Sequence, residues 1–190
     1  MRLAIYGGTF DPIHCAHLTV AREAAERFAL DRVLFVPAAK PPHKSGAAAA
    51  SYEHRLRMAE LACAGEPRFE ASRLESGPET SYTILTLERL RATLEASDKM
   101  YFLIGADAFA EIETWFRWRD VIDLADFIVV SRPGHPCANP AGARIERLET
   151  LALDVASSDL RRRLAAGESP RELPPAVLEF IRQNGLYRAA

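Results

Sequence analysis

The sequence predicts an α/β fold: a Rossmann-like, doubly wound and mostly parallel sheet with helices on both faces. Two observations predict this class. Continuous apolar runs alternate with segments in which apolar residues recur at helical spacing. Runs that are apolar throughout are typical of strands buried on both faces, as they are in parallel sheets.

The predicted strands are short apolar runs, most of which end at a glycine or a proline. They are residues 2–6, 33–37, 100–105, 126–134 and 151–155. A further segment, residues 68–75, alternates between apolar and polar side chains like a half-buried strand.

The segments between these runs have the spacing of amphipathic helices. The predicted helices are residues 17–29, 51–63, 81–94 and 175–183, and another that begins at Ser157.

Paired prolines and a Ser-Gly pair in residues 37–50 predict a mobile loop. No internal repeat or linker divides the chain. We therefore expect a single domain over residues 1–190, with a small helical segment over about 157–190 at its C-terminal end.

The composition is that of an ordinary globular protein: of 190 residues, 48% are hydrophobic and 26% are charged, and the formal net charge is −2. This balance provides no field to attract nucleic acid or an anionic membrane, so neither is an expected partner. No apolar run reaches the roughly 20 residues that span a bilayer, and the first is too short for a signal peptide. The three cysteines lack a framework spacing, which favours a reducing compartment. We expect a cytoplasmic protein, and homo-oligomer formation stays open.

Motifs of polar and small residues follow the predicted strands. GGTF, KPPHK, GAD, SRPG and SSDLR come after the first to fifth apolar runs in turn. In parallel sheets, ligands bind beyond the carboxyl ends of the strands, where the strand order reverses. The sequence therefore predicts one site at this edge of the sheet.

The stretch GGTFDPIHCAH has the residue types of a phosphate site. Gly7 and Gly8 permit a sharp turn and a close approach of ligand to backbone. His14 and His17 fall at the start of the next helix, where free N–H groups and the helix dipole favour an anion. Two alternatives are helix-capping histidines and a zinc fragment that includes Cys15. Adjacent His14 and Cys15 cannot easily face one tetrahedral ion, so we expect no protein-held metal.

Taken together, the motifs resemble those of the bacterial nicotinate-mononucleotide adenylyltransferases, in the nucleotidyltransferase superfamily. The resemblance covers nearly the whole chain and is carried by motifs in order: GGTFDPIHCAH, KPPHK, SYTILTL, FLIGAD, TW, SRPG, VASSDLR and a closing GLY.

The resemblance implies roles for matching positions. His14, His17 and Arg161 would be catalytic and contact the phosphates of ATP. Further ATP-binding residues would be Gly8, Thr9, Phe10, Gly105, Asp107, Arg132, Ser157 and Ser158. Mononucleotide-binding residues would be Lys40, Lys44, Ser81, Tyr82, Thr83 and Trp115.

The implied reaction transfers the adenylyl group of ATP to nicotinate mononucleotide, releasing pyrophosphate and forming nicotinate adenine dinucleotide in NAD biosynthesis. A phosphate monoester is largely dianionic near neutrality, with a second pKa of about 6, so its attack needs no general base. It needs in-line positioning and stabilisation of the departing charge. Mg²⁺ would arrive with ATP, held mainly by substrate and water.

Several alternatives remain at this stage. The acceptor could be nicotinamide mononucleotide or phosphopantetheine, although SYT and TW favour a flat pyridine ring. A non-catalytic nucleotide-binding regulator is disfavoured by the joint presence of His17 and Arg161. Ser157 could simply cap its helix, Trp115 could belong to the core, and Lys40 and Lys44 could be ordinary loop residues.

Two positions depart from the family pattern. Ala16 stands where a glycine is usual, which is harmless only if that position is helical. Ala156 replaces a serine and so removes one hydroxyl donor.

Overall fold

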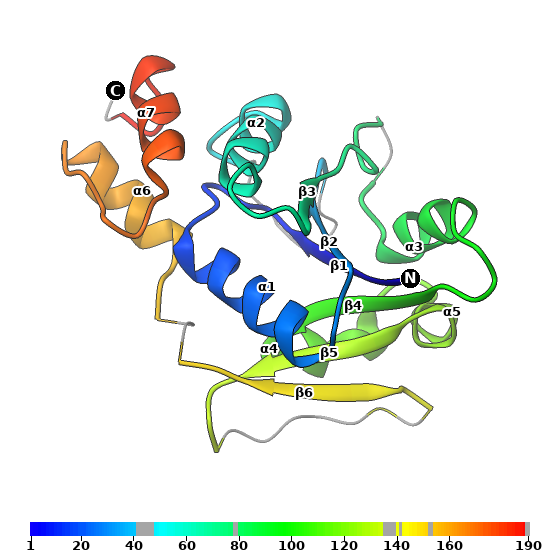
Figure 1. The fold of residues 1–190 in the computed structure, drawn as a ribbon. Coiled ribbons are helices and arrows are strands. Elements are labelled where there is room, and N and C mark those ends of the chain that lie inside the picture. Colours follow the sequence, from blue (N-terminus) through cyan, green and yellow to red (C-terminus); the bar gives the residue numbers. More distant parts are fainter. Residues whose placement is uncertain (41–47, 78–79, 135–139, 141, 152–153, 189–190) are drawn as a thin grey trace.

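A computed structural model describes residues 1–40, 48–77, 80–134, 140, 142–151 and 154–188. They contain one six-stranded sheet in the order β3-β2-β1-β4-β5-β6, in which every pair of neighbours is parallel (Figure 1). The strands are β1 (Arg2–Gly8), β2 (Arg32–Pro37), β3 (Phe69–Ala71), β4 (Lys99–Gly105), β5 (Asp126–Ser131) and β6 (Ile145–Glu149).

The strand order reverses beside β1. The chain runs outward from β1 to β2 and β3, then returns to the other side of β1 and continues through β4, β5 and β6. Ile5 of β1 lies opposite Leu34 of β2 and Phe102 of β4. A crevice is therefore expected where the carboxyl ends of β1 and β4 part, as the sequence predicted.

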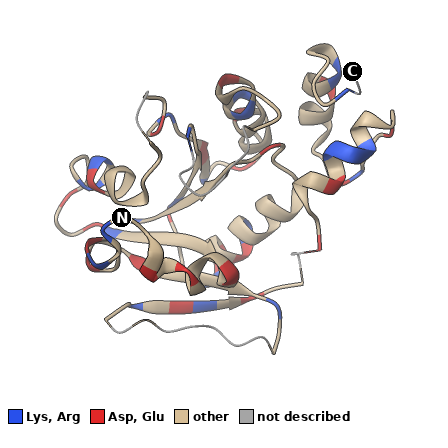
Figure 2. Ribbon diagram, turned by 180° about the vertical axis from the view of Figure 1, so that it is seen from behind, with Lys and Arg blue, Asp and Glu red and all other residues tan. Residues whose placement is uncertain are grey.

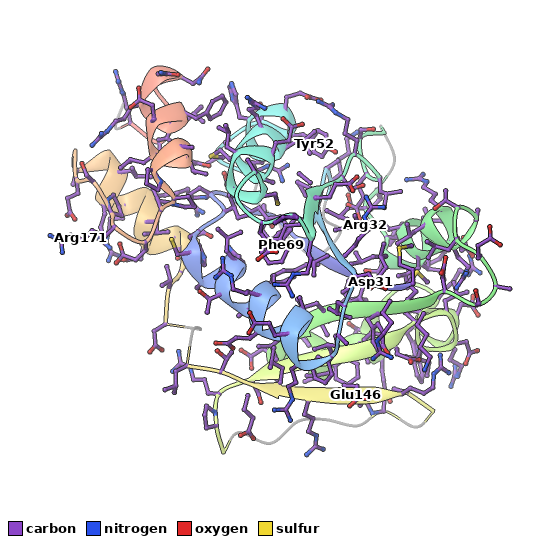
Figure 3. All side chains as sticks on the ribbon, viewed as in Figure 1. Asp31, Arg32, Tyr52, Phe69, Glu146 and Arg171 are labelled. Atoms are coloured by element: carbon purple, nitrogen blue, oxygen red, sulfur yellow. The ribbon has the colours of Figure 1, made fainter. Side chains whose placement is uncertain are left out.

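One face of the sheet is covered by α1 (Cys15–Arg27) and α2 (Tyr52–Cys63), and α7 (Pro175–Gln183) packs against α2. The helix α6 (Ser157–Ala165) lies next to α7, near the N-terminal end of α1 (Figure 1). Phe69, labelled in Figure 3, belongs to the apolar cluster under these helices.

The other face is covered by α3 (Thr83–Arg91), α4 (Ala106–Ala110), the 3-10 turn η1 (Ile112–Thr114) and α5 (Trp118–Leu124). Their buried side chains form a second apolar cluster with Leu3, Phe102 and Phe127 of the sheet. The predicted Rossmann-like fold with helices on both faces is thus confirmed.

Most predicted elements are confirmed, and one strand was misplaced. The sixth strand is β6, and Leu151, in the run predicted as the last strand, is 80% exposed outside any strand. Residues 152–153 of that run lie outside the described residues. β6 is a sheet edge with the sequence IERLE, whose charged side chains hid it from a search for apolar runs.

The extents of two strands differ from the prediction, and two helices are additional. β3 has only three residues, β5 ends before Arg132, and the helices α4 and α5 were not predicted. Residues 41–47 of the predicted mobile loop lie outside the described residues, so its mobility stays a prediction. Within the described part of the chain, no helix is long and apolar enough to cross a lipid bilayer.

Leu103→Ala is expected to lower the free energy of unfolding by about 3 kcal/mol, because Leu103 is fully buried in β4 and the substitution leaves a cavity. Urea denaturation would measure the loss. Leu151→Ala is the matched control, because the same atoms are removed from an exposed side chain and should cost about 0.5 kcal/mol or less. Equal losses in the two variants would contradict this account of the core.

Candidate functional site

A cavity of about 310 Å³ opens at the carboxyl ends of β1, β2 and β4. It lies where the strand order reverses, and the start of α3 and the segment after α4 complete its walls. Of the residues singled out from the sequence, those that line it are Gly7, Gly8, Thr9, Ser81, Tyr82, Thr83, Gly105 and Trp115.

Aromatic rings form one wall of the cavity. Trp115 meets Phe102 edge-on at a centroid distance of 6.2 Å, while Phe116 lies 4.7 Å from Tyr82 at the rim. The Phe116 side chain is 51% exposed. Such rings offer flat apolar contact to a planar ligand. Phe116 was not predicted as a site residue, because in TWFRW only the tryptophans were considered as ring contacts.

The turn that was predicted at Gly7 and Gly8 lies further along the chain, while both glycines line the cavity. Both are the last residues of β1, and the left-handed backbone that turns the chain is at Phe10, with φ 49°. A Cβ on Gly8 would lie 3.1 Å from the Phe10 ring. Glycine is needed here for the close approach of that ring, and Phe10 itself is buried in the core.

His14 and His17 lie at the start of α1, as predicted. His14 is the N-cap residue, and its N–H donates to His17 Nδ1 at 3.2 Å. Because Nδ1 of His17 accepts, the proton of its neutral ring is on Nε2. The two rings stack with centroids 3.7 Å apart, and Phe10 meets His17 edge-on at 5.0 Å.

Burial favours the neutral form of both imidazoles. Burial lowers the pKa of His14 to about 4, although the negative charge of Glu172 acts in the opposite direction. Burial, followed by the charge of His14, holds the pKa of His17 well below its usual value. An anion bound at these rings would oppose both shifts and favour protonation.

The start of α6 meets the loop that precedes α1. Arg161 Nη1 donates to the backbone oxygen of Asp11 at 2.7 Å, and the Ser157 hydroxyl donates to the backbone oxygen of Pro12 at 3.0 Å. Ser158 is exposed, and the N-cap position, Ala156, makes no side-chain cap. Two helix N-termini therefore lie close together. In α6 the first turn contains Asp159 and the basic residues follow it along the helix (Figure 2).

Asp11 ties this region together. Its buried carboxylate accepts from the backbone N–H groups of Ala49 (2.7 Å) and Ala50 (3.1 Å) and from the Tyr187 hydroxyl (2.7 Å). Arg161 Nη1 lies 3.9 Å from the same carboxylate. Sequence analysis did not single out Asp11, because its partners come from distant segments.

The remaining predicted residues lie outside the cavity wall. The backbone of Lys40 pairs with Ser81 through the Ser81 hydroxyl and N–H, both at 3.0 Å. Arg132 forms an exposed ion pair with Asp154 at 2.8 Å, and Asp107 is exposed on α4. Lys44 lies outside the described residues.

Ala16 does not disturb the site. It is the second residue of α1, in ordinary helical conformation, and is nearly buried. A glycine is not required there, so this departure from the family pattern is harmless.

The chain is similar in sequence to known proteins over most of its length. The family model described as Cytidylyltransferase-like matches residues 5–163. A probable nicotinate-nucleotide adenylyltransferase of Solibacter usitatus is 59% identical, covering 98% of this chain and 100% of that protein. Another, from a strain of Thermus thermophilus, is 43% identical, covering 99% of this chain and 100% of that protein.

The fold of the chain is also similar to that of a solved structure. The Plasmodium falciparum nicotinic acid mononucleotide adenylyltransferase, in complex with NaAD, superposes with a TM-score of 0.80 at 21% identity. The match covers 98% of this chain and 97% of that one.

The buried neutral imidazole of His14 should make stability depend on pH. Between its ordinary pKa of 6.5 and its pKa of about 4, the unfolded chain binds a proton that the folded chain does not. Stability should therefore fall as the pH drops through this window. His14→Gln is expected to reduce the loss between about pH 7 and pH 5 by ~2 kcal/mol.

Urea denaturation at several pH values would measure this difference. His54→Gln is the control, because it makes the same substitution at a histidine outside the site. The His54 ring packs edge-on against Phe180 of α7. Identical pH slopes for the H14Q variant and the unmodified chain would show that His14 does not titrate as its burial requires.

Proposed function

Because this chain belongs to the nicotinate-nucleotide adenylyltransferases, within the cytidylyltransferase-like family, we propose that it joins ATP and nicotinate mononucleotide. The products are nicotinate adenine dinucleotide and pyrophosphate, and the reaction serves NAD biosynthesis. The observation that carries the proposal is the cavity with an aromatic wall at the end of β1. Tyr6, which lines this cavity, has its ring centroid 6.0 Å from that of His17, in the histidine pair at the start of α1.

The cavity suits the mononucleotide. Its pyridine ring would lie against the aromatic wall formed by Trp115 and Phe116. The first N–H groups of α3, beginning at Thr83, have no partners within the helix and lie beside this wall. They can bind the carboxylate of nicotinate, which distinguishes the acid from the amide.

The reaction itself needs positioning and charge stabilisation. A phosphate oxygen of the mononucleotide attacks the α-phosphorus of ATP, and the bond to the β-phosphate oxygen breaks as pyrophosphate leaves. His17, with its proton on Nε2, and His14 would donate to the phosphates. Arg161 and the N-terminus of α6, with Ser157 and Ser158, would stabilise charge on the departing pyrophosphate.

Magnesium is proposed to enter as the ATP complex. Among the described residues, no three His, Cys, Asp or Glu side chains are grouped as metal ligands. In this proposal, the ion is held mainly by phosphates and water. Mg²⁺ would neutralise phosphate charge during the transfer.

The adenosine and loop contacts remain proposals from the family resemblance. Gly105 and Asp107, at the start of α4, would face the ribose, and Arg132 the adenine. Lys40 lies at the cavity rim, next to Ser81. Lys44 would contact phosphate from the segment that follows.

A cytoplasmic location is also proposed. It is supported by Cys15 and Cys63, which are free thiols, as is usual in reducing compartments.

The deciding assay is pyrophosphate release from Mg·ATP with nicotinate mononucleotide, nicotinamide mononucleotide and phosphopantetheine compared side by side. We expect a strong preference for the nicotinate form, with a loss of about 100-fold or more in kcat for His17→Ala, because a transition-state donor is removed. Preference for the amide would keep the reaction and change the acceptor. Release with none of the three, from folded protein, would refute the proposed function.

Trp115→Ala is expected to raise KM for nicotinate mononucleotide about tenfold or more while changing KM for ATP little, because only the ring contact is lost. Trp118→Ala is the matched control, since Trp118 is nearby on α5 but does not line the cavity. If the two variants raised KM equally, the aromatic wall would not be the ring site.

A further inference from the structure

Two buried polar atoms near the start of α1 have no hydrogen-bond partner among the described residues. One is Nδ1 of His14, a side chain that is 4% exposed overall. The other is Oε2 of Glu172, in the connection between α6 and α7. A buried donor or acceptor without a partner costs free energy, so such atoms indicate a missing interaction.

The backbone holds these two residues close to each other. The N–H of Cys15, the residue after His14, donates to the backbone oxygen of Glu172 at 2.7 Å. The negative charge of Glu172 acts on the His14 ring and opposes the effect of burial on the pKa of that ring. Arg171, the preceding residue, lies at the outer surface of the connection (Figure 3).

Glu172 is held in its ionised form. Its other oxygen, Oε1, accepts from Arg163 Nη1 at 2.9 Å, and this hydrogen bond lowers the pKa of Glu172. Arg163 also donates through Nε to Glu168 at 3.0 Å. The Arg163 guanidinium therefore fixes the carboxylate on one side and leaves Oε2 unpaired on the other.

We propose that Glu172 is a positioning residue, which favours the protonated form of His14 when the polyphosphate of ATP is bound. The inference rests on the proposed function, because it needs an anion at the His14 ring. In the protonated ring Nδ1–H would donate to Glu172, and Nε2–H would donate to a phosphate oxygen. A neutral ring cannot donate from both nitrogens.

The other charged and titratable groups around His14 do not supply this interaction. His17, on the same helix, disfavours a second positive charge. Asp11 is occupied by Ala49, Ala50 and Tyr187. On α6, Arg161 is bound to the Asp11 backbone and Arg163 to Glu172. Glu172 is therefore the counter-charge that this site offers to a protonated His14.

The test is an NMR titration of the histidine rings in the full chain, with and without α,β-methylene ATP and in the absence of any acceptor mononucleotide. The chain has five histidines, and the His14 signal is assigned by its loss in His14→Gln. In the unmodified chain, the pKa of His14 should rise when the analogue binds. A ring that stays neutral at about pH 6 with the analogue bound would overturn the proposal without any further variant.

Glu172→Gln keeps the size of the side chain and an acceptor for Arg163 but removes the charge. The pKa of His14 should be lower in this variant, both free and with the analogue. Its KM for ATP should rise about three- to tenfold, with KM for nicotinate mononucleotide unchanged. Glu172→Asp, which keeps the charge, should restore most of the effect.

Glu168→Gln is the matched control, because it removes the other carboxylate bound to Arg163. It should leave the pKa of His14 unchanged. Equal changes in E168Q and E172Q would assign the effect to Arg163 and overturn the proposal. The titration contains no acceptor, so it is decided independently of whether pyrophosphate release succeeds.

Discussion

The buried carboxylate of Asp11 is the interaction on which the arrangement of the site depends. It accepts from Ala49 and Ala50 before α2 and from Tyr187 near the C-terminal end, while Arg161 of α6 binds its backbone oxygen. Burying a carboxylate without hydrogen-bond donors would cost much free energy. The segments that carry these donors must therefore come together around Asp11 for the fold to be stable. The loop leading to His14 is fixed by that convergence.

This loop places two imidazoles, whose pKa values are lowered by burial, where we propose that the phosphates of ATP bind. His14 and His17 stack on each other at the start of α1, and burial keeps both neutral without ligand. A site of this kind gains positive charge only when an anion arrives, because the anion and the proton stabilise each other. Interactions that strengthen as negative charge develops accelerate a reaction, whereas interactions of constant strength only improve binding.

The parts of the fold that depend on local pattern could be predicted from the sequence, and those that depend on distant contacts could not. Continuous apolar runs revealed β1, β2, β4 and β5, because strands in the middle of a parallel sheet are buried on both faces. The edge strand β6 was not predicted, because its charged side chains interrupt the apolar pattern. At the site, motif residues were found, but Phe116, Asp11 and Glu172 act through partners that only the folded chain brings near.

Two carboxylates beside the proposed polyphosphate site require a physical reason, since both would repel the ligand. Asp11 is surrounded by donors, Glu172 is bound through Oε1 to Arg163, and neither residue is among those that line the cavity. The proposed anion affinity comes from Arg161, from helix N-termini and from protons taken up by the histidines, which respond to the charge of the ligand. The near-neutral chain can therefore hold a polyanion without a basic surface field.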